Sequence, residues 1–325
     1  MKITANEFIF PIQPDIQCHA SHILPLENNE LFCVFFYGSQ EGNTDVRIFG
    51  SLRGEDGKWT EPAPISEDDG IPHWNPVLHR LKDGSVQLFY KVGHTIPNWV
   101  TYCKLSRDNC RTWSDPFPLV PDDTSGGRGP VRNKILNLPD GTLLAPGSTE
   151  QGEWVCFFDR SEDDGQHWNR SSDIRIFSNV STDSPETYRR GIIQPSLWQS
   201  EAGIHALLRS SEGTIFRTDS KDGIIWCKPY STGIPNNNSG LDLAQISDGR
   251  ILLCCNPVSE NWGARTPLSL YISHDNGKFF ELFTHLNTTA DSEFSYPALV
   301  YQAGKLHITY TWNRRTIQYM CLEDI

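Results

Sequence analysis

A repeat of about 55 residues runs through the chain and constrains its fold more than any other feature. Each clear copy begins with serine, places an aspartate two positions later and ends in an aromatic residue; these copies are residues 106–113, 161–168 and 273–280. Weaker copies end at Trp59 and Trp226. The closing aromatic residues recur every 54 to 58 residues. A fixed period of this size is typical of chains built from stacked or radially repeated units.

The chemistry of the repeat predicts tight turns between short strands. An aspartate accepts hydrogen bonds from the amides of a turn, and a glycine supplies the positive φ that many turns need. A second recurring phrase lies upstream of several copies and places Asp-Gly between two apolar runs, at Asp83-Gly84, Asp140-Gly141 and Asp248-Gly249. Asp-Gly in this setting is a strong hairpin signal. Each unit therefore reads as four short antiparallel strands, which is the pattern of a propeller blade.

Five copies of the turn and a final unit at 294–322 predict an all-β, six-bladed β-propeller. The last unit lacks the serine–aspartate turn, so we expect the N-terminal segment, about 3–11, to supply its outer strand and close the ring. No stretch resembles a linker, and we expect residues 1–325 to form a single domain.

Composition excludes several classes of function. The formal net charge is −12, which disfavours nucleic-acid binding because that needs a basic face. No apolar run approaches the length of a membrane span, and we expect a cytoplasmic protein with no membrane partner. The nine cysteines contain no Cys-x-x-Cys pair, and we expect buried free thiols in a reducing compartment. There is no glycine-rich phosphate loop, and we expect neither a cofactor nor a metal site.

Topology predicts which face of the propeller carries chemistry. The serine–aspartate turns share one face, so the starts of the innermost strands and the loops between the second and third strands share the other. This second face is rich in arginine although the chain is acidic. It therefore predicts an anionic ligand, because one guanidinium group can bind a carboxylate through two parallel hydrogen bonds. Its candidate ligand-binding residues are His73, Asn75, Trp99, Arg132, Gln194, Arg209, Arg265 and Arg314, and Glu41, Asp45 and Glu150 are carboxylates able to pair with the arginines.

The serine–aspartate turn resembles the Asp-box of the sialidase (neuraminidase) superfamily. The whole chain is most similar to its bacterial BNR-repeat group of predicted neuraminidases. The phrases that carry this resemblance include Trp74-Asn-Pro-Val, Gly129-Pro-Val-Arg-Asn-Lys134, Gln194-Pro-Ser-Leu and Ser292-Glu-Phe-Ser-Tyr296-Pro. They cover nearly all of the chain. The resemblance implies a sialidase-like propeller and an exo-acting glycosidase whose partner is an acidic, sialic-acid-like carbohydrate.

The resemblance also implies roles for single residues. Tyr296 takes the position of the nucleophile and Asp45 that of the acid/base, with Glu41 as a further acidic candidate in the same loop. Arg209 and Arg265 take two of the three positions that hold the substrate's carboxylate. The pattern departs from the family at two points. His19 stands near the position of the first arginine, and we expect it to act as a base; Gln194 stands near that of the glutamate behind the tyrosine.

These departures leave two alternatives open. A lyase acting beside a uronic acid needs a Tyr/His acid–base pair and an arginine, with no glutamate behind the tyrosine. A carbohydrate-binding propeller without catalytic activity would keep the arginines and stacking tryptophans and would not need Asp45 or Tyr296. The sequence leaves open the sugar, its linkage, the stereochemical outcome and the oligomeric state.

Overall fold

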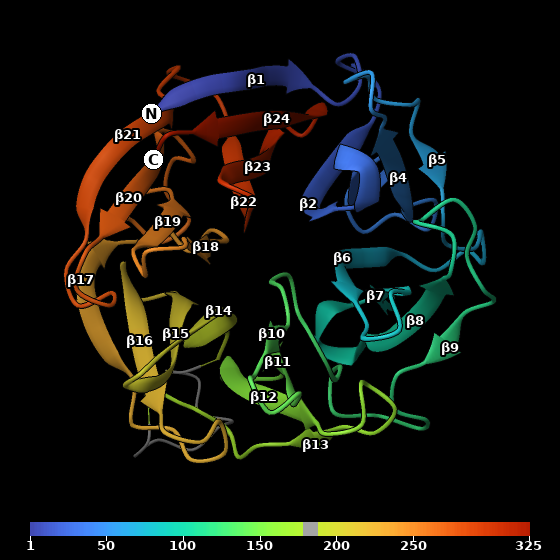
Figure 1. The fold of residues 1–325 in the computed structure, drawn as a ribbon. Coiled ribbons are helices and arrows are strands. Elements are labelled where there is room, and N and C mark those ends of the chain that lie inside the picture. Colours follow the sequence, from blue (N-terminus) through green and yellow to red (C-terminus); the bar gives the residue numbers. More distant parts are fainter. Residues whose placement is uncertain (178–187) are drawn as a thin grey trace.

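The computed structural model describes residues 1–177 and 188–325 and contains six four-stranded antiparallel sheets set around a common axis (Figure 1). The predicted fold class and blade number are confirmed. Blade one consists of β2 (Gln17–Pro25), β3 (Leu31–Gly38), β4 (Arg47–Arg53) and β5 (Ala63–Pro64). Blade two consists of β6 (His73–Arg80), β7 (Val86–Val92), β8 (Val100–Ser106) and β9 (Phe117–Pro118). Blade three consists of β10 (Leu136–Asn137), β11 (Leu143–Thr149), β12 (Val155–Ser161) and β13 (Asn169–Arg170).

The remaining blades follow the same order from the axis outward. Blade four consists of β14 (Ile192–Ser200), β15 (Gly203–Ser210), β16 (Thr214–Ser220) and β17 (Tyr230–Pro235). Blade five consists of β18 (Asp242–Gln245), β19 (Ile251–Cys255), β20 (Leu268–Ser273) and β21 (Glu281–Asn287). Blade six contains β22 (Phe294–Gln302), β23 (Lys305–Trp312) and β24 (Thr316–Glu323). Two 3-10 turns, η1 (Glu27–Asn29) and η2 (Ile96–Asn98), complete the elements. Among the described residues no helix has the length and apolar character needed to cross a membrane.

The N-terminal strand completes blade six. β1 (Lys2–Phe8) pairs antiparallel with β24, from Lys2 opposite Glu323 to Phe8 opposite Gln318. Figure 1 shows this strand along the outer edge of the ring beside β24, with the two termini close together. The ring is therefore closed by main-chain hydrogen bonds between the two ends of the described chain.

The hydrophobic core is divided among the junctions between blades. Strands of blades one and two share one cluster that includes Val34 and Leu88, and strands of blades five and six share another that includes Leu252 and Leu306. Four further clusters occupy the other junctions. Both faces of each sheet are covered in this way, which explains why the strands read as nearly continuous apolar runs. Eight of the nine cysteines are buried as free thiols, and Cys227 is exposed.

The Asp-box turns have the predicted hydrogen bonds. In the third blade, Asp163 Oδ1 accepts from the His167 amide at 2.9 Å and from Ser161 Oγ at 2.8 Å, and the amide of Gly165 donates to Ser161 Oγ. The copies around Asp108 and Asp275 repeat this arrangement. These turns are hydrogen-bonded within themselves, so they define a structural face of the propeller.

The opposite end of four innermost strands carries a β-bulge. The register of β2, β6, β14 and β22 shifts by one residue near the start of each strand, and the residue at the shift has positive φ: Ala20 (54°), Asn75 (44°), Gln194 (54°) and Tyr296 (53°). A left-handed backbone costs about 1–3 kcal/mol for a residue other than glycine, and such residues concentrate at functional sites. The bulges therefore mark the end of the axis where a site is expected.

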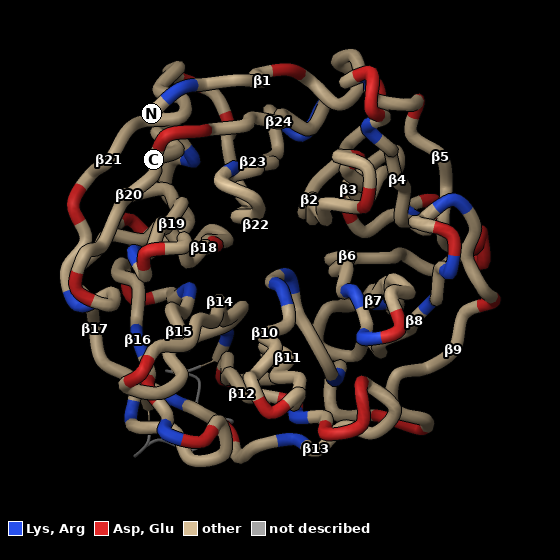
Figure 2. Tube along the Cα trace, in the orientation of Figure 1, with Lys and Arg blue, Asp and Glu red and all other residues tan. Residues whose placement is uncertain are grey.

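Three consecutive residues before β10 connect blade three to three other blades. Arg132 donates to the carbonyl oxygens of Tyr296 and Pro297 in blade six. Asn133 Nδ2 donates to the carbonyls of residues 194 and 195 in blade four, both at 3.0 Å. Lys134 Nζ donates to both carboxylate oxygens of Asp242 in blade five. Figure 2 shows this segment reaching toward the axis, with its inner end coloured for Lys and Arg. We call residues 132–134 the axial hub.

Candidate functional site

Tyr296 lies at the centre of the arginine-rich end of the axis. Its hydroxyl accepts a hydrogen bond from Arg209 Nη1 at 2.6 Å. The ring of His19 packs against its ring, with a centroid separation of 4.0 Å and a tilt of 43°. Tyr296 is 9% exposed and His19 is 2% exposed. The structure thus brings together three of the residues that the sequence predicted, from blades six, four and one.

His19 is held as a neutral side chain. Its Nδ1 lies 2.8 Å from Thr311 Oγ1, and its Nε2 has no hydrogen-bond partner in the described part of the chain. Burial lowers the pKa of His19 well below its usual value, and the positive charges of nearby arginines lower it further; these are Arg314, Arg265, Arg132 and Arg209. The contacts connect His19 to the ring of Tyr296 rather than to its hydroxyl, so they do not show the hydroxyl–imidazole bond that a base would use.

Four guanidinium groups surround Tyr296. The Cζ atoms of Arg132, Arg209 and Arg265 lie 5.4, 5.7 and 5.6 Å from the centroid of its ring, and Arg314 is joined to this group through a shared carboxylate. Arg209 Nε also donates to Asn238 Oδ1 at 2.8 Å. The Nη2 groups of Arg209, Arg265 and Arg314 make no hydrogen bond within residues 1–177 and 188–325. Three donors are therefore left for an anionic ligand.

Glu293 orients two of these arginines. Its Oε1 accepts from Arg265 Nη1 at 2.8 Å and from Arg314 Nε at 3.0 Å. Burial raises the pKa of Glu293, but the two arginines outweigh burial and hold its pKa below the usual value. Arg314 Nη1 also donates to Glu41, which carries the network into blade one. The group of four guanidiniums thus contains arginines that bind two carboxylates, those of Glu293 and Glu41. The net charge of these six groups is positive.

Glu150 is the carboxylate that the sequence interpretation undervalued. It directly follows β11. The end of that strand contacts the bulge of blade four, because the backbone amide of Gln194 donates to Ser148 Oγ at 3.2 Å. Burial raises the pKa of Glu150, and the charges of Arg209 and Arg189 oppose the shift. A carboxylate whose pKa is raised toward neutrality is suited to proton transfer. The sequence signal was its position at the end of a second strand on the functional face.

The other predicted residues divide into two groups. Gln194 Oε1 accepts from the same Arg209 nitrogen that binds Tyr296, at 3.1 Å, and Asn75 occupies the equivalent bulge of blade two. His73 and Trp99 lie elsewhere: His73 Nδ1 is 2.6 Å from Ser66 Oγ, and Trp99 Nε1 donates to the carbonyl of Gly126. Both side chains are buried and bonded within the wall of blade two, so the structure does not bring them to Tyr296.

Asp45 lies on the exposed rim of blade one. Its two carboxylate oxygens accept from the amide and hydroxyl of Ser39, each at 2.8 Å. It lines a surface pocket with Tyr37 and Asp68, and no contact within the described residues joins it to Tyr296. Glu41, in the same loop, connects that loop to the arginine group through Arg314. Sequence reasoning also missed Glu293 and Trp262, whose ring lies 5.7 Å from the Arg209 Cζ, because the loops that carry them do not share the repeat pattern.

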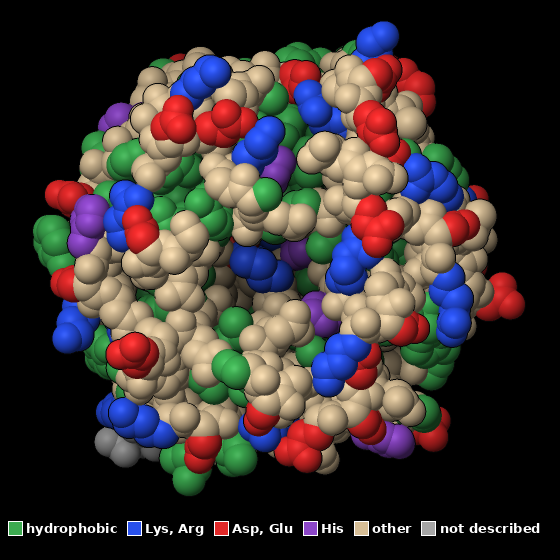
Figure 3. Space-filling view, viewed as in Figure 1, with side chains coloured by type: hydrophobic (Ala, Val, Ile, Leu, Met, Phe, Trp, Pro, Cys, Tyr) green, Lys and Arg blue, Asp and Glu red, His purple; other side chains and the backbone are tan. Residues whose placement is uncertain are grey.

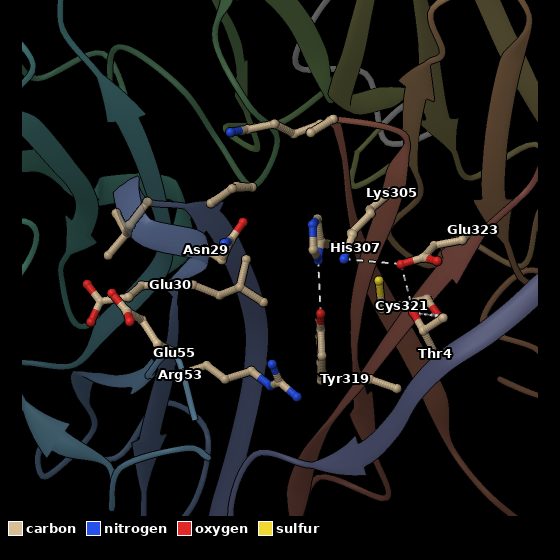
Figure 4. Close-up of a pocket in the computed structure, with 16 residues that line it drawn as sticks. Thr4, Asn29, Glu30, Arg53, Glu55, Lys305, His307, Tyr319, Cys321 and Glu323 are labelled. Atoms are coloured by element: carbon tan, nitrogen blue, oxygen red, sulfur yellow. Dashed lines mark hydrogen bonds and ion pairs between the residues drawn. The ribbon is translucent and has the colours of Figure 1, made fainter. Parts of the chain in front are cut away.

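A cavity also lies at the opposite face, which carries the Asp-box turns, but several of its polar groups are paired with one another. It has a volume of about 260 Å³ and lies between blades one and six, near β1 and η1 (Figure 4). Its charged and polar groups bind one another: His307 Nδ1 lies 2.9 Å from the Tyr319 hydroxyl, and Lys305 pairs with Glu323 at 3.1 Å.

The central hollow of the ring is a separate place. Figure 3, viewed as Figure 1, shows Lys or Arg side chains deep in this hollow. The open arginine donors around Tyr296 make that end the stronger candidate site.

A family model agrees with the geometry. The model of the BNR repeat-like domain matches residues 29–308, which is most of the chain. No curated protein matches the sequence.

Solved structures share the fold. A protein of unknown function from Dyadobacter fermentans is 16% identical with a TM-score of 0.78, over 99% of this chain and 98% of that one. A mutant form of the NanB sialidase from Streptococcus pneumoniae is 12% identical with a TM-score of 0.71, over 97% and 71%. Trypanosoma rangeli sialidase bound to the inhibitor DANA is 13% identical with a TM-score of 0.71; 98% of this chain is matched, but it spans only 59% of that protein.

Proposed function

This chain belongs to the BNR repeat-like domain family of sialidase-like propellers, and within it we propose a glycoside hydrolase that releases an acidic, sialic-acid-like sugar from a small glycoconjugate. The observation that supports this most directly is the hydrogen bond of 2.6 Å from Arg209 Nη1 to the Tyr296 hydroxyl, set among guanidiniums with open Nη2 donors. A tyrosine held at the centre of an arginine group suits attack on an anomeric carbon that carries a carboxylate, where a carboxylate nucleophile would be repelled.

The substrate's carboxylate is bound by Arg209, Arg265 and Arg314. Arg314 extends from the turn between β23 and β24 and supplies the third guanidinium, in place of the arginine that is missing at the start of blade one. Glu293 holds Arg265 and Arg314 at a common oxygen. Charge-assisted bonds of this kind contribute about 1.5–3 kcal/mol each when well formed.

The reaction uses Tyr296 and two carboxylates. The Tyr296 oxygen attacks the anomeric carbon while Glu150 accepts the phenolic proton, and Asp45 protonates the leaving oxygen. A water molecule, deprotonated by Asp45, then displaces the sugar from Tyr296, and Glu150 returns the proton. Glu150 thereby takes the part of the base that Gln194 cannot play, because an amide is not basic at neutral pH.

A lyase is the second candidate, favoured by one specific contact. The rings of His19 and Tyr296 lie 4.0 Å apart with an arginine on the hydroxyl. In β-elimination beside a uronic acid, one member of such a pair removes the proton next to the carboxylate and the other protonates the leaving oxygen. This reaction would need neither Glu150 nor Asp45.

Product analysis separates these functions. The purified protein is incubated with sialyl-lactose and with a glucuronate-terminated oligosaccharide, and the products are followed by mass and by absorbance of an unsaturated uronate. Free sialic acid that disappears with Tyr296→Phe supports the hydrolase. An absorbing product identifies the lyase instead. If neither substrate is converted but the acidic sugars bind in calorimetry, the protein is a binding propeller and the hydrolase proposal is wrong.

A further inference from the structure

The axial hub contains a cation whose charge is not balanced by the protein. Arg132 is 0% exposed. Its Nη2 donates to the carbonyl oxygens of Tyr296, at 2.6 Å, and Pro297, and these are neutral groups. No ion pair of Arg132 with a carboxylate occurs within residues 1–177 and 188–325. Buried charges in proteins are normally paired, because an isolated ion is very costly to remove from water.

Two donor atoms of the same guanidinium are also unsatisfied. Arg132 Nε and Nη1 are buried and have no hydrogen-bond partner in the described chain. The carboxylate that Lys134 binds is already engaged: the oxygens of Asp242 accept from Lys134, at 2.8 and 2.7 Å, and also from Ser196 and the Leu299 amide. Asp242 therefore has no capacity left to bind Arg132.

A third unsatisfied group belongs to the same region. His19 Nε2 is buried and has no partner among the described residues, and the His19 ring contacts the Tyr296 ring that Arg132 also faces. The hydrogen bond between His19 Nδ1 and Thr311 Oγ1 is compatible with either tautomer; when the hydroxyl is the donor, the neutral imidazole carries its proton on Nε2 and can donate it. The region around Tyr296 thus holds up to three donor atoms without a partner in the described chain and one uncompensated positive charge, on side chains from blades one and three.

We propose that the axis of this propeller binds a small inorganic monoanion, of the size and charge of a halide, against Arg132 Nε and Nη1 with His19 Nε2 as a further donor. An anion balances the buried guanidinium and satisfies its open N–H groups in one step. The substrate's carboxylate is a poor occupant, because Arg132 is fully buried. The proposed site uses other atoms than the three Nη2 groups that bind the sugar.

The direct test is anomalous diffraction from crystals of the whole chain grown in sodium bromide. We expect a bromide peak within hydrogen-bonding distance of Arg132 in the channel. If bromide appears at surface sites while Arg132 Nε and Nη1 bind water, the proposal is wrong. The same crystals soaked with sodium acetate distinguish a carboxylate source, since an acetate that replaces bromide at Arg132 would overturn the assignment to an inorganic halide.

A second test uses solution stability. The unfolding temperature is measured in increasing sodium chloride and in sodium gluconate at equal ionic strength. We expect a saturable rise on the order of a few °C with chloride alone, because a ligand that binds only the folded state stabilises it. Arg132→Lys, which replaces Nε, Nη1 and Nη2 by a single ammonium group and so removes both proposed guanidinium donors, should lose this saturable rise. The control Arg111→Gln, at an exposed arginine paired with Glu30, should keep it.

The bromide measurement is independent of the sugar chemistry. It uses no carbohydrate or sugar acid, so it holds whether the protein proves to be a hydrolase, a lyase or a binding propeller. An equal response to chloride and gluconate in the native protein would contradict the proposal. If Arg132→Lys does not fold, the bromide crystals of the native chain still decide.

Discussion

Arg209 binds the hydroxyl of Tyr296 across 87 residues of sequence, with Nη1 and Oη 2.6 Å apart. The main chain of the same tyrosine is bound from blade three, because Arg132 donates to its carbonyl oxygen. Tyr296 also has a left-handed backbone, with φ of 53°. Two arginines from different blades therefore hold both ends of one strained residue, which fixes the direction of its hydroxyl.

Replacing Tyr296 by phenylalanine removes the nucleophile and leaves the ring contacts with His19 in place. We expect kcat for release of the acidic sugar to fall by roughly 10³-fold or more, since a phenylalanine ring cannot form the covalent intermediate. Calorimetry should show that the free sugar still binds within about threefold of the native affinity, because its carboxylate contacts arginines. Retained turnover in the variant would exclude Tyr296 as nucleophile.

The arginine clamp predicts a different kinetic effect. Arg265→Gln and Arg314→Gln each remove one guanidinium from the carboxylate site, and we expect KM to rise by about 10–100-fold with a smaller change in kcat. Initial rates over a range of substrate concentrations separate the two parameters. Arg111→Gln, on the Asp-box face, serves as the matched control. A loss confined to kcat would mean that these arginines act only in the transition state.

Glu150 should control the acidic side of the pH profile. Its pKa is raised by burial, and a base acts only when ionised, so kcat/KM should fall as the pH drops through this raised pKa. We expect Glu150→Gln to lower the rate by roughly 10²–10⁴-fold and to abolish that acidic limb. The control is Glu55→Gln, at an exposed carboxylate of the opposite face. An unchanged limb in Glu150→Gln would assign the base elsewhere.

Buried histidines make the folded state sensitive to mild acid. Burial lowers the pKa of His22 to about 3, and that of His79 and His307 to about 4. In the unfolded chain these groups titrate near about 6.5. Because the folded pKa values are depressed, the stability contribution is complete above that unfolded pKa. It is lost as the pH falls toward the folded values, by about 1.4 kcal/mol per pH unit for each histidine.

Urea unfolding between pH 7.5 and 4.5 checks this prediction. His79→Gln should reduce the slope of stability against pH by the contribution of one histidine, about 1.4 kcal/mol per unit. His274→Gln is the control, because His274 is exposed, and it should leave the slope unchanged. A stability that is flat from pH 7 to 5 would show that the buried histidines accept protons without unfolding the blades.

The fold was predictable because its signal is periodic. The Asp-box turns around Asp108, Asp163 and Asp275 recur with the blades, and their hydrogen bonds are local, so the sequence around each one specifies it. The same repeat also indicated where each innermost strand begins. It placed Tyr296 and Gln194 near the starts of two such strands, at one end of the axis, as the structure has them.

The connections within the site could not be predicted in the same way. Glu293 reaches Arg314 only because two loops of blade six approach each other, and Glu41 joins them from another blade. The sequence placed Arg132 among the ligand-binding residues, but it gave no sign that this side chain is fully buried and donates to the main chain of blade six. These contacts depend on how loops of unequal length extend from the ring, and a repeat pattern carries no such information.

The pairing of β1 with β24 sets an order of events during synthesis. Lys2 lies opposite Glu323, so β1 must wait for β24, which follows it by most of the sequence and emerges roughly 15–65 s later at usual rates of translation. Until then blade six has an unpaired outer edge, and such edges recruit strands from other chains. A nascent chain of this kind depends on keeping one short strand unattached until its partner emerges.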